Sequence, residues 1–307
     1  MKITQLTKIA VNKSKFNTLS DFIDFADRYL EYVAADKLQA VIVSQNENHY
    51  RFYQYGTDGH YQITRPINSR LMYGINEFSK IKKSFHALLK NAKDVKTKND
   101  KEAINKAVYT LQMSIGSALD ALPAGKSNTA RKINGDLFER LIRLVIRETG
   151  IKCESGVLQI PVIVDGQEAF KMSYQHDLIV KEADIIKLIG SIKTSSKDRL
   201  DKIFIDKFLY SKLTETNTPH VAVFLNDVQR KNGRKENEYG INATFLPGHF
   251  KGYTVKLNPL DGVYYCDIRP NMLTEDILKE HIRTFDHLIC EDIWKFLKSP
   301  VREFKGQ

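Results

Sequence analysis

Residues 172–199 read MSYQHDLIVKEADIIKLIGSIKTSSKDR, and this stretch decides the fold that we expect. Its two apolar runs, LIV and IIKLIGSI, lie on either side of a short polar turn, which predicts two paired strands. Asp177 comes at the head of the first run and Lys193 ends the second, with Ser191 two positions earlier. Side chains two apart share a face of a strand. We therefore expect Ser191 and Lys193 to point together, with Asp177 alongside them.

A carboxylate and a lysine on neighbouring strands suit the metal-assisted cleavage of a phosphodiester. A hard cation polarises the phosphoryl oxygen and acidifies a water molecule, and it prefers carboxylate and carbonyl oxygens as ligands. Asp177 is a candidate ligand for such a cation. Lys193 is a candidate for orienting or deprotonating the attacking water and for offsetting transition-state charge. Because such sites normally use two or more acids, we expect a second acid elsewhere.

The second acid is expected on a helix within residues 127–150, SNTARKINGDLFERLIRLVIRETG. Leucines and valines recur there at helical spacing, with Asn134 as the predicted N-cap and Gly150 as the predicted stop. Glu139 would then lie in the first two turns, where the helix dipole favours an anion. The sequence predicts that Glu139 points at the same metal ion as Asp177.

Glu139, Asp177 and Ser191-Ile192-Lys193 together resemble the site of the PD-(D/E)xK nucleases, and within them the type II restriction endonucleases. In that family a helix with a glutamate precedes a strand ending near an aspartate, and the next strand carries an acid, any residue and a lysine. The resemblance covers roughly residues 134–210. His176 stands where the family has proline, and Ser191 stands where it usually has the acid.

The serine leaves the second metal ligand open between several acids. Restriction enzymes that look similar also carry Ser-x-Lys and recruit a carboxylate from the following helix, which is expected here over residues 197–213. The acids available on that segment are Asp198, Asp201 and Asp206. Glu139 is favoured over Asp206. Ser195 and Asp198 also fit a capped helix start, which is a purely structural role.

The resemblance implies a fold and an activity. The implied fold is an α/β restriction-endonuclease-like core, a mixed sheet flanked by helices. The implied activity is Mg²⁺-dependent, sequence-specific hydrolysis of double-stranded DNA that leaves 5′-phosphate and 3′-hydroxyl ends. Lys193 would assist the water, and Ser191 would supply a hydroxyl or accept a metal-bound water. A homodimer that cuts both strands, and a cognate DNA methyltransferase as genetic companion, are also implied.

Two other functions fit the same residues. One is a repair or recombination nuclease of the same superfamily, which would prefer branched or damaged DNA. The other is a DNA-binding protein without catalysis, in which Asp177 and Lys193 form only an ion pair at a strand end. Metal-dependent cleavage separates the second from both nucleases, and discrete fragments from intact DNA separate a restriction enzyme from a repair enzyme.

The charge of the chain fits a nucleic-acid partner. Its 307 residues hold 47 Lys and Arg against 37 Asp and Glu, a formal charge of +10, which favours a polyanion. Lys197 and Arg199 follow the strand of Lys193 and are candidate DNA contacts. Arg230 and Arg234 lie in QRKNGRK, expected to be a polar loop, and have the bidentate chemistry that reads guanine.

Two regions are expected along the chain. Residues 1–125 read as mainly helical with a small aromatic-rich hairpin, and residues 126–307 as the catalytic domain. A closing helix is expected over residues 274–296. The three cysteines are widely spaced, which predicts packed thiols rather than a zinc site or disulfides. The chain has no apolar run long enough for a membrane span and no signal-peptide pattern, so a cytoplasmic protein is expected.

Overall fold

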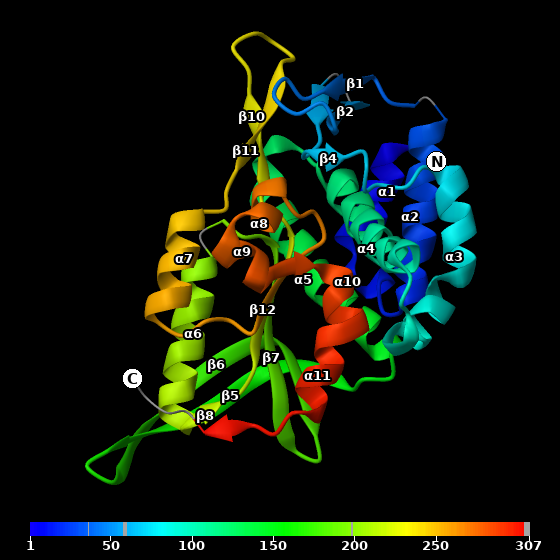
Figure 1. Cartoon of the computed structure of the whole chain (residues 1–307). Helices are drawn as coiled ribbons and strands as arrows, with labels where there is room; N and C mark the ends of the chain where they lie inside the picture. Colours follow the sequence, from blue (N-terminus) through cyan, green and yellow to red (C-terminus); the bar gives the residue numbers. More distant parts are fainter. Residues whose placement is uncertain (36, 58–59, 198, 304–307) are drawn as a thin grey trace. The chain divides into compact units, whose positions relative to one another are not determined.

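The computed structural model describes residues 1–35, 37–57, 60–197 and 199–303, and Figure 1 labels its elements. The chain forms two compact units that are interleaved along the sequence. Unit 1 comprises Met1–Asn91, Val95–Val145 and Asp227–Thr244, and unit 2 comprises Ala92–Asp94, Ile146–Asn226 and Phe245–Gln307. The sequence predicts a single boundary between two regions, after residue 125, and this boundary stays a prediction.

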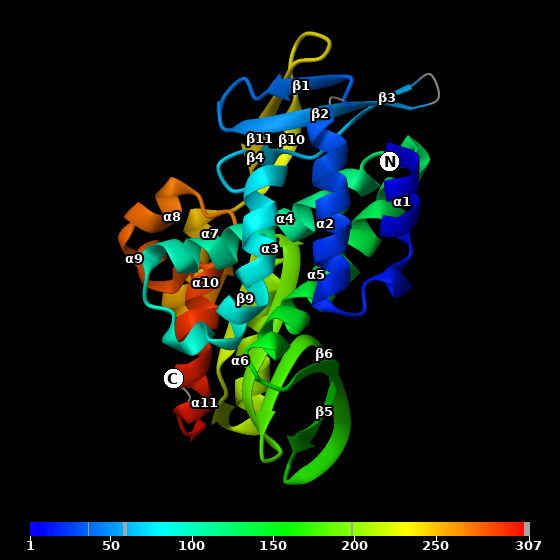
Figure 2. The same cartoon turned by 90° about the vertical axis from the view of Figure 1, so that its right-hand side faces the viewer.

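Unit 1 is built around helix α4 (Lys98–Leu119), which contacts three other helices. These are α1 (Ile3–Val11), α2 (Leu19–Ala34) and α3 (Ile75–Lys90), as Figure 2 shows. Every residue of α4 from Ala107 to Leu119 is buried, which is expected of a helix surrounded by others. The predicted helical character of this region is therefore confirmed.

Unit 1 also holds a small sheet and a hairpin. The sheet pairs β1 (Ala40–Val43) and β3 (His60–Ile63) with β2 (Tyr50–Thr57), and β4 (Ile67–Asn68) also pairs with β2. Tyr50 and Phe52 are buried against Val228 and Ile241, so these aromatic side chains pack a core. Val228 and Ile241 come from the hairpin β10 (Val228–Asn232) and β11 (Tyr239–Ala243).

The hairpin corrects one prediction. QRKNGRK was expected to be a loop, but its first four residues belong to strand β10, which pairs with β11. The reason is a contact distant in sequence: Val228 and Ile241 gain a buried place beside Tyr50 and Phe52 when the strands form. The polar residues of the segment fall on the exposed positions of the hairpin.

Unit 2 is organised by a six-stranded mixed sheet in the order β13-β12-β9-β7-β6-β5. The strands are β5 (Cys153–Val164), β6 (Gln167–Glu182), β7 (Ile185–Ser195), β9 (His220–Asn226), β12 (Gly262–Tyr265) and β13 (Ile282–Thr284). β5, β6 and β7 pair antiparallel, and β7, β9, β12 and β13 pair parallel. All seven residues of β9 are buried, because parallel strands are covered on both faces. The expected mixed α/β core is confirmed.

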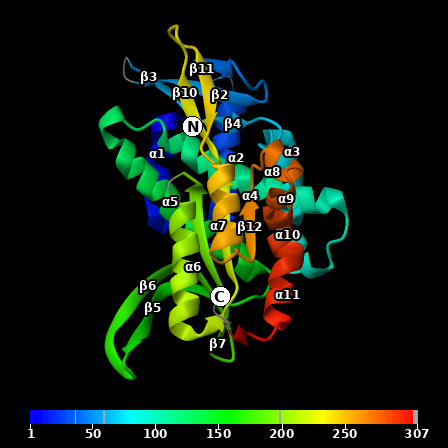
Figure 3. The same ribbon diagram turned by 60° about the vertical axis from the view of Figure 1, so that its left-hand side comes forward.

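Helices α6 (Leu200–Thr214) and α7 (Pro247–Lys256) lie along one side of this sheet (Figure 3). Phe204 of α6 and Phe250 of α7 contact each other edge to face at 5.7 Å between ring centroids. Both are completely buried in a core that also holds Phe224 and Tyr265 from the sheet. This packing sets the position of α6, which begins five residues after the end of β7.

Three predicted elements differ from the structure. The helix expected to start at Asn134 is α5 (Ser127–Glu148), and Asn134 is buried inside it, where its side-chain oxygen and its carbonyl accept hydrogen bonds from Gln112. The sequence of residues 244–268, with Asp261-Gly262 as a turn signal, indicates aromatic-rich strands; Gly262–Tyr265 does form strand β12, but Pro247–Lys256 forms helix α7, which starts with proline in the first turn. The closing helix is interrupted, because Ile282–Thr284 pairs with β12 as β13. Gly150 lies just after the end of α5, where the sequence predicts the helix to stop, and it has a positive φ of 88°.

Two further predictions concern the cysteines and the apolar length of the helices. Cys153, Cys266 and Cys290 are buried and are not joined by disulfides within the described residues, as expected of packed thiols. No helix within the described ranges is long and apolar enough to cross a membrane.

Candidate active site

Asp177 and Lys193 meet on the adjacent strands β6 and β7. The Lys193 ammonium donates to the Asp177 carboxylate, with Nζ 2.5 Å from Oδ2. The side chain of Asp177 is 13% exposed and that of Lys193 is 33% exposed, so the pair is open to solvent on the lysine side. The sequence prediction that these two residues lie together is confirmed by this geometry.

Asp177 also completes the pairing of the two strands. The antiparallel register runs through Leu178 and Gly190 and goes no further toward Asp177. Beyond that point the backbone amide of Ile192 donates to Asp177 Oδ2 at 2.8 Å. A side-chain carboxylate therefore accepts an amide at the place where β6 and β7 separate.

Gly190 allows this close approach of the two strands. A Cβ atom added at Gly190 would lie 2.9 Å from Cδ2 and 3.1 Å from Cβ of Leu178, which is its partner across the strand pair. Real Cβ atoms hardly ever come so close to a neighbouring carbon. The glycine thus places β6 against β7 one residue away from the Asp177 carboxylate.

Ser191 lies two positions before Lys193 on β7, where alternation puts both side chains on one face. β7 pairs in parallel with β9 at this point, with Ser191 opposite Ala222. The side chain of Ser191 is half-buried. The predicted grouping of a carboxylate, a lysine and a hydroxyl at the end of two strands is therefore compatible with the strand register.

The candidate second acids lie on different elements and differ in exposure. Glu139 is in the middle of α5 rather than in its first two turns, so the helix dipole gives it no support. It belongs to unit 1 whereas Asp177 belongs to unit 2, and its role as a ligand stays a prediction. Asp198 lies outside the described residues. Asp201 is exposed in the first turn of α6.

Asp206 belongs to unit 2 and lies near the Asp177 strand. It is half-buried on α6 and forms an ion pair with Lys202 one turn earlier. Burial lowers the pKa of His176, and the charges of Asp206 and Asp177 both act against that lowering. Both carboxylates are thus within electrostatic reach of one imidazole.

His176, which precedes Asp177 on β6, is a structural residue. It is 5% exposed and its ring stacks on Tyr174, with centroids 6.1 Å apart and planes 4° from parallel. Tyr210 of α6 and His220 of β9 contact the same ring edge to face. The histidine therefore belongs to the packing between α6 and the sheet.

The donor set fits a hard divalent cation with few protein ligands. Mg²⁺ is usually held by one or two carboxylates, and water and substrate phosphate complete its coordination. Asp177 with one further acid would satisfy this pattern. Among the described residues, no group of three or more His, Cys, Asp or Glu side chains is arranged to hold a metal ion.

The candidate DNA contacts fall into two groups. Lys197 and Arg199 are exposed in the segment between β7 and α6, where the amide of Lys197 donates to Ser195 Oγ. Arg230 donates to the carbonyl of Ile63 at 2.6 Å and lies 5.6 Å from the ring centre of Tyr239. Arg230 therefore has an internal role within unit 1.

Arg234 is exposed in the turn of the same hairpin and is the better candidate of the two for a DNA contact. Ser195 does not cap α6, whose N-cap residue is Arg199 and has no side-chain cap. The predicted helix start also involves Asp198, which lies outside the described residues.

Sequence reasoning missed Lys207, which fixes α6 to the sheet. Its side chain is 2% exposed and donates to Asp261 Oδ2 at 2.7 Å and to the carbonyl of Pro259. Asp261 also accepts the amide of His220, the first residue of β9. Lys207 lies four residues after Ile203 and three before Tyr210, both buried, and this helical spacing was the signal that it points inward.

Comparison with solved structures shows that the chain has the fold of the type II restriction endonucleases. Over the whole chain it is similar to the type IIP restriction endonuclease Kpn2I, with a TM-score of 0.70 and 16% sequence identity, covering 96% of this chain and 97% of that one. A complex of the restriction endonuclease PspGI with substrate DNA also matches, with a TM-score of 0.41 and 14% identity over 71% of this chain and 92% of that one. No family model and no curated protein matches the sequence. The fold assignment rests on the Kpn2I likeness.

Proposed function

We propose that this protein is a type II restriction endonuclease that hydrolyses double-stranded DNA at a specific sequence with Mg²⁺ as cofactor. The observation that carries the proposal is the contact of Lys193 with Asp177 at the point where β6 and β7 separate, within a restriction-endonuclease fold. The structural similarity to Kpn2I supports the fold, and the activity is inferred from the residues at the site.

Asp177 and one further acid would hold the cation, with Asp206 and Glu139 as the candidates. When bound, Mg²⁺ polarises the phosphoryl oxygen and lowers the pKa of a water molecule. Lys193 lies next to the ligand carboxylate, where its ammonium can orient that water and offset the charge of the transition state. Ser191, on the same face as Lys193, can accept a hydrogen bond from a water molecule.

The reaction that follows is a single displacement at phosphorus. The water oxygen forms a bond to phosphorus while the bond to the 3′ oxygen breaks. The leaving oxygen gains a proton and becomes a 3′-hydroxyl, and the phosphate stays on the 5′ end. A homodimer would cut both strands of a two-fold symmetric site, and a DNA methyltransferase of the same specificity would protect the host.

The positive charge of the chain supports a DNA partner, because each phosphate contact by Lys or Arg releases a counterion. Lys197 and Arg199 would contact the backbone close to the cleaved bond. Arg234 would contact DNA from the β10–β11 hairpin of unit 1.

Digestion of unmethylated phage DNA with the purified protein, in Mg²⁺ and in EDTA, tests the proposal. We expect discrete fragments in Mg²⁺ only, with ends that share one short sequence when they are cloned and sequenced. Cleavage confined to branched or damaged DNA would identify a repair nuclease of the same fold instead. Intact DNA under varied metals and salts, together with a measurable binding constant, would indicate a DNA-binding protein without catalysis.

A further inference from the structure

The β10–β11 hairpin of unit 1 has two faces of different character. In an antiparallel pair, residues directly opposite each other share a face, and successive residues alternate between the faces. Val228 and Ile241 lie on one face, where they are buried against Tyr50 and Phe52 of β2. Two opposite pairs form the other face, which we call the outer face: Gln229 with Asn242, and Lys231 with Gly240. The hairpin thus packs on its own unit through one face only.

The outer face is polar, and none of its four residues is acidic. Gln229, Lys231 and Asn242 are exposed, whereas Gly240 lies against Asn46, whose Oδ1 would be 2.9 Å from an added Cβ. Asn and Gln pair with N6 and N7 of adenine in DNA, and Lys pairs with O6 and N7 of guanine. The outer face therefore carries three side chains of the kinds that read base edges.

The hairpin is held firmly on the small sheet of unit 1. Asn46 donates from Nδ2 to the carbonyl of Ile241 at 2.9 Å and accepts the amide of the same residue at 3.0 Å. The carbonyl of Tyr239 accepts the amide of Gln45 at 3.0 Å. On the other strand, Arg230 donates to the carbonyl of Ile63. Both strands are therefore anchored, and a recognition surface is most precise on such a rigid element.

The dimensions of the hairpin suit the major groove of B-DNA. That groove is about 12 Å wide and admits a two-stranded β ribbon. Gln229 and Lys231 are two residues apart on β10, a separation of about 6.8 Å, which is close to two steps of about 3.4 Å along DNA. Asn242 lies directly opposite Gln229, so the two carboxamides form one end of the outer face. Lys231 then reaches a base pair about two steps away from them.

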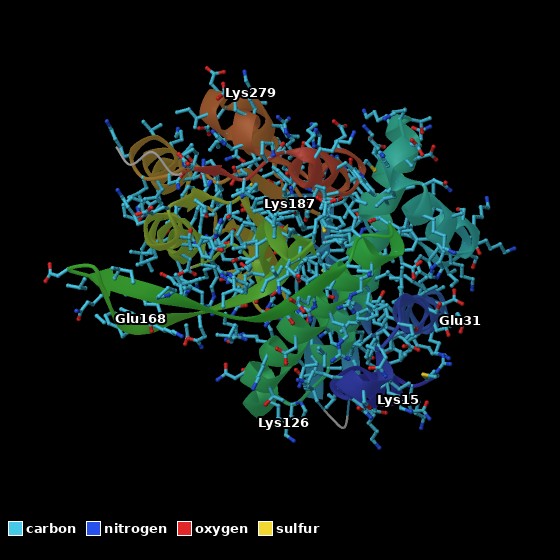
Figure 4. The ribbon with its side chains drawn as sticks, turned by 90° about the horizontal axis from the view of Figure 1, so that it is seen from below. Lys15, Glu31, Lys126, Glu168, Lys187 and Lys279 are labelled. Atoms are coloured by element: carbon cyan, nitrogen blue, oxygen red, sulfur yellow. The ribbon has the colours of Figure 1, made fainter. Side chains whose placement is uncertain are left out.

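Charge distinguishes this hairpin from the β5–β6 hairpin. Residues 228–243 hold four basic and two acidic residues, which gives a net charge of +2. Residues 157–175, in the β5–β6 hairpin that Figure 4 shows with Glu168 near its end, hold one lysine against two acids, which gives −1. A polyanion is attracted to the first hairpin and not to the second. The charge therefore indicates duplex DNA as the partner of the outer face.

We propose that the outer face of the β10–β11 hairpin is a base-reading surface, on which Gln229 and Asn242 read adenine and Lys231 reads guanine in the major groove. The proposal rests on the proposed function, from which it takes duplex DNA as the partner. It replaces Arg230 as the reader of guanine, because Arg230 lies on the opposite face and is engaged within unit 1. The recognized sequence then contains an A·T pair and a G·C pair about two steps apart.

Selection of bound duplexes from a pool with a random central segment, followed by sequencing, tests the proposal. The full-length Lys193→Ala variant is used in Mg²⁺ and again in EDTA, so that binding is measured without cleavage. We expect one short enriched sequence. Adding Gln229→Ala or Asn242→Ala should remove the preference for adenine at one position, and adding Lys231→Ala should remove the preference for guanine. Gln159→Ala changes an exposed glutamine of the β5–β6 hairpin and is the matched control, which should leave the enriched sequence unchanged.

Dissociation constants from fluorescence anisotropy separate base reading from contact with the DNA backbone. Each outer-face substitution should weaken binding to the enriched duplex by at least about fivefold, which is the lower end of the discrimination that one bidentate base contact provides. Binding to a duplex of unrelated sequence should change much less. The circular dichroism spectrum and melting temperature of each variant check that the fold is retained, as the exposure of the three side chains leads us to expect.

Three results would overturn the proposal. They are the absence of any enriched sequence in both buffers, an enriched sequence that all three outer-face variants retain, and equal weakening of the enriched and unrelated duplexes. Loss of base preference in these variants of a protein whose wild type cleaves no DNA would support the base-reading surface and refute the proposed function. Site-specific cleavage by the wild type, with the base preference unchanged in the variants, would do the reverse.

Discussion

The Asp177 carboxylate accepts the backbone amide of Ile192, 2.8 Å from Oδ2, at the point where strands β6 and β7 stop pairing. The same oxygen accepts the Lys193 ammonium. One carboxylate oxygen therefore both links the two strands and contacts the candidate catalytic lysine. A substitution of Asp177 should change both the stability and the activity of the protein.

Asp177→Asn and Asp177→Ala should separate these two roles. Asparagine keeps an oxygen that accepts the Ile192 amide, whereas alanine leaves this amide without its partner, at a cost of about 1–3 kcal/mol. We expect urea denaturation to show a clear loss of stability for Asp177→Ala and a smaller one for Asp177→Asn. Both variants should lose cleavage. Equal stability of Asp177→Ala and the wild type would show that the amide contact contributes nothing.

Two glycines in helices of unit 1 should respond in opposite ways to alanine. Gly135 in α5 has open space where a Cβ would lie, so Gly135→Ala should stabilise by about 0.5–1 kcal/mol through helix propensity. A Cβ at Gly116 in α4 would lie 2.5 Å from Nη1 of Arg65, whose guanidinium is paired with Asp120.

Gly116→Ala should therefore displace Arg65 from Asp120 and lower the free energy of unfolding by at least about 1 kcal/mol. Thermal or urea denaturation of the two variants measures the difference. A stabilising effect at both positions would mean that Arg65 moves aside without cost.

The buried His220 should make the protein sensitive to acid. Complete burial lowers the pKa of His220 to about 3, while in the unfolded chain it titrates near its ordinary value of 6.5. Between these two values the unfolded state binds the extra proton and the folded state does not. Stability should therefore fall as the pH drops below about 6.5, by up to about 1.4 kcal/mol for each pH unit.

His220→Leu should reduce this dependence, and His249→Gln should not, because His249 is exposed on α7. Urea denaturation at several pH values between 4 and 7 gives the slopes. Identical slopes for the wild type and His220→Leu would contradict the assignment to His220.

Lys207→Met should be among the more damaging single substitutions in unit 2. It removes the buried ammonium from a pair whose carboxylate is 27% exposed, and breaking a fully buried pair costs about 3–5 kcal/mol, which is the upper bound here. Lys202→Met is the matched control on the same helix, since its ion pair with Asp206 is 70% exposed on the lysine side and should contribute less than about 1 kcal/mol. Comparable losses of stability in the two variants would show that Lys207 does not anchor α6.

The parts of the fold that depend on local pattern were predictable. The apolar runs of β7 and β9 and the alternation of β5 indicate strands, and the positions of Asp177 and Lys193 follow from their places beside the apolar runs of β6 and β7. The contact between them needed only the assumption that the two strands pair.

The errors come from contacts between residues distant in sequence. Asn134 resembles an N-cap, yet it is buried and engaged by Gln112, so α5 starts a full two turns earlier. Ile282–Thr284 has a helical neighbourhood, yet it forms a parallel strand with β12. Lys207 has the helical spacing of an inward-facing residue, but its partner Asp261 lies 54 residues later and is not indicated by any local pattern.

Cleavage of DNA by Lys193→Ala, compared with Lys181→Ala, tests the central claim most directly. Lys181 is the matched control, because it is a lysine of β6 paired with Glu154 at 2.7 Å and has no part in the proposed chemistry. We expect Lys193→Ala to bind DNA but to cleave it at least a hundredfold more slowly than the wild type, and Lys181→Ala to cleave at the wild-type rate, by the general magnitude of ~10²–10⁴ for such groups. Wild-type cleavage by a folded Lys193→Ala variant would contradict the assignment of the active site to Asp177 and Lys193.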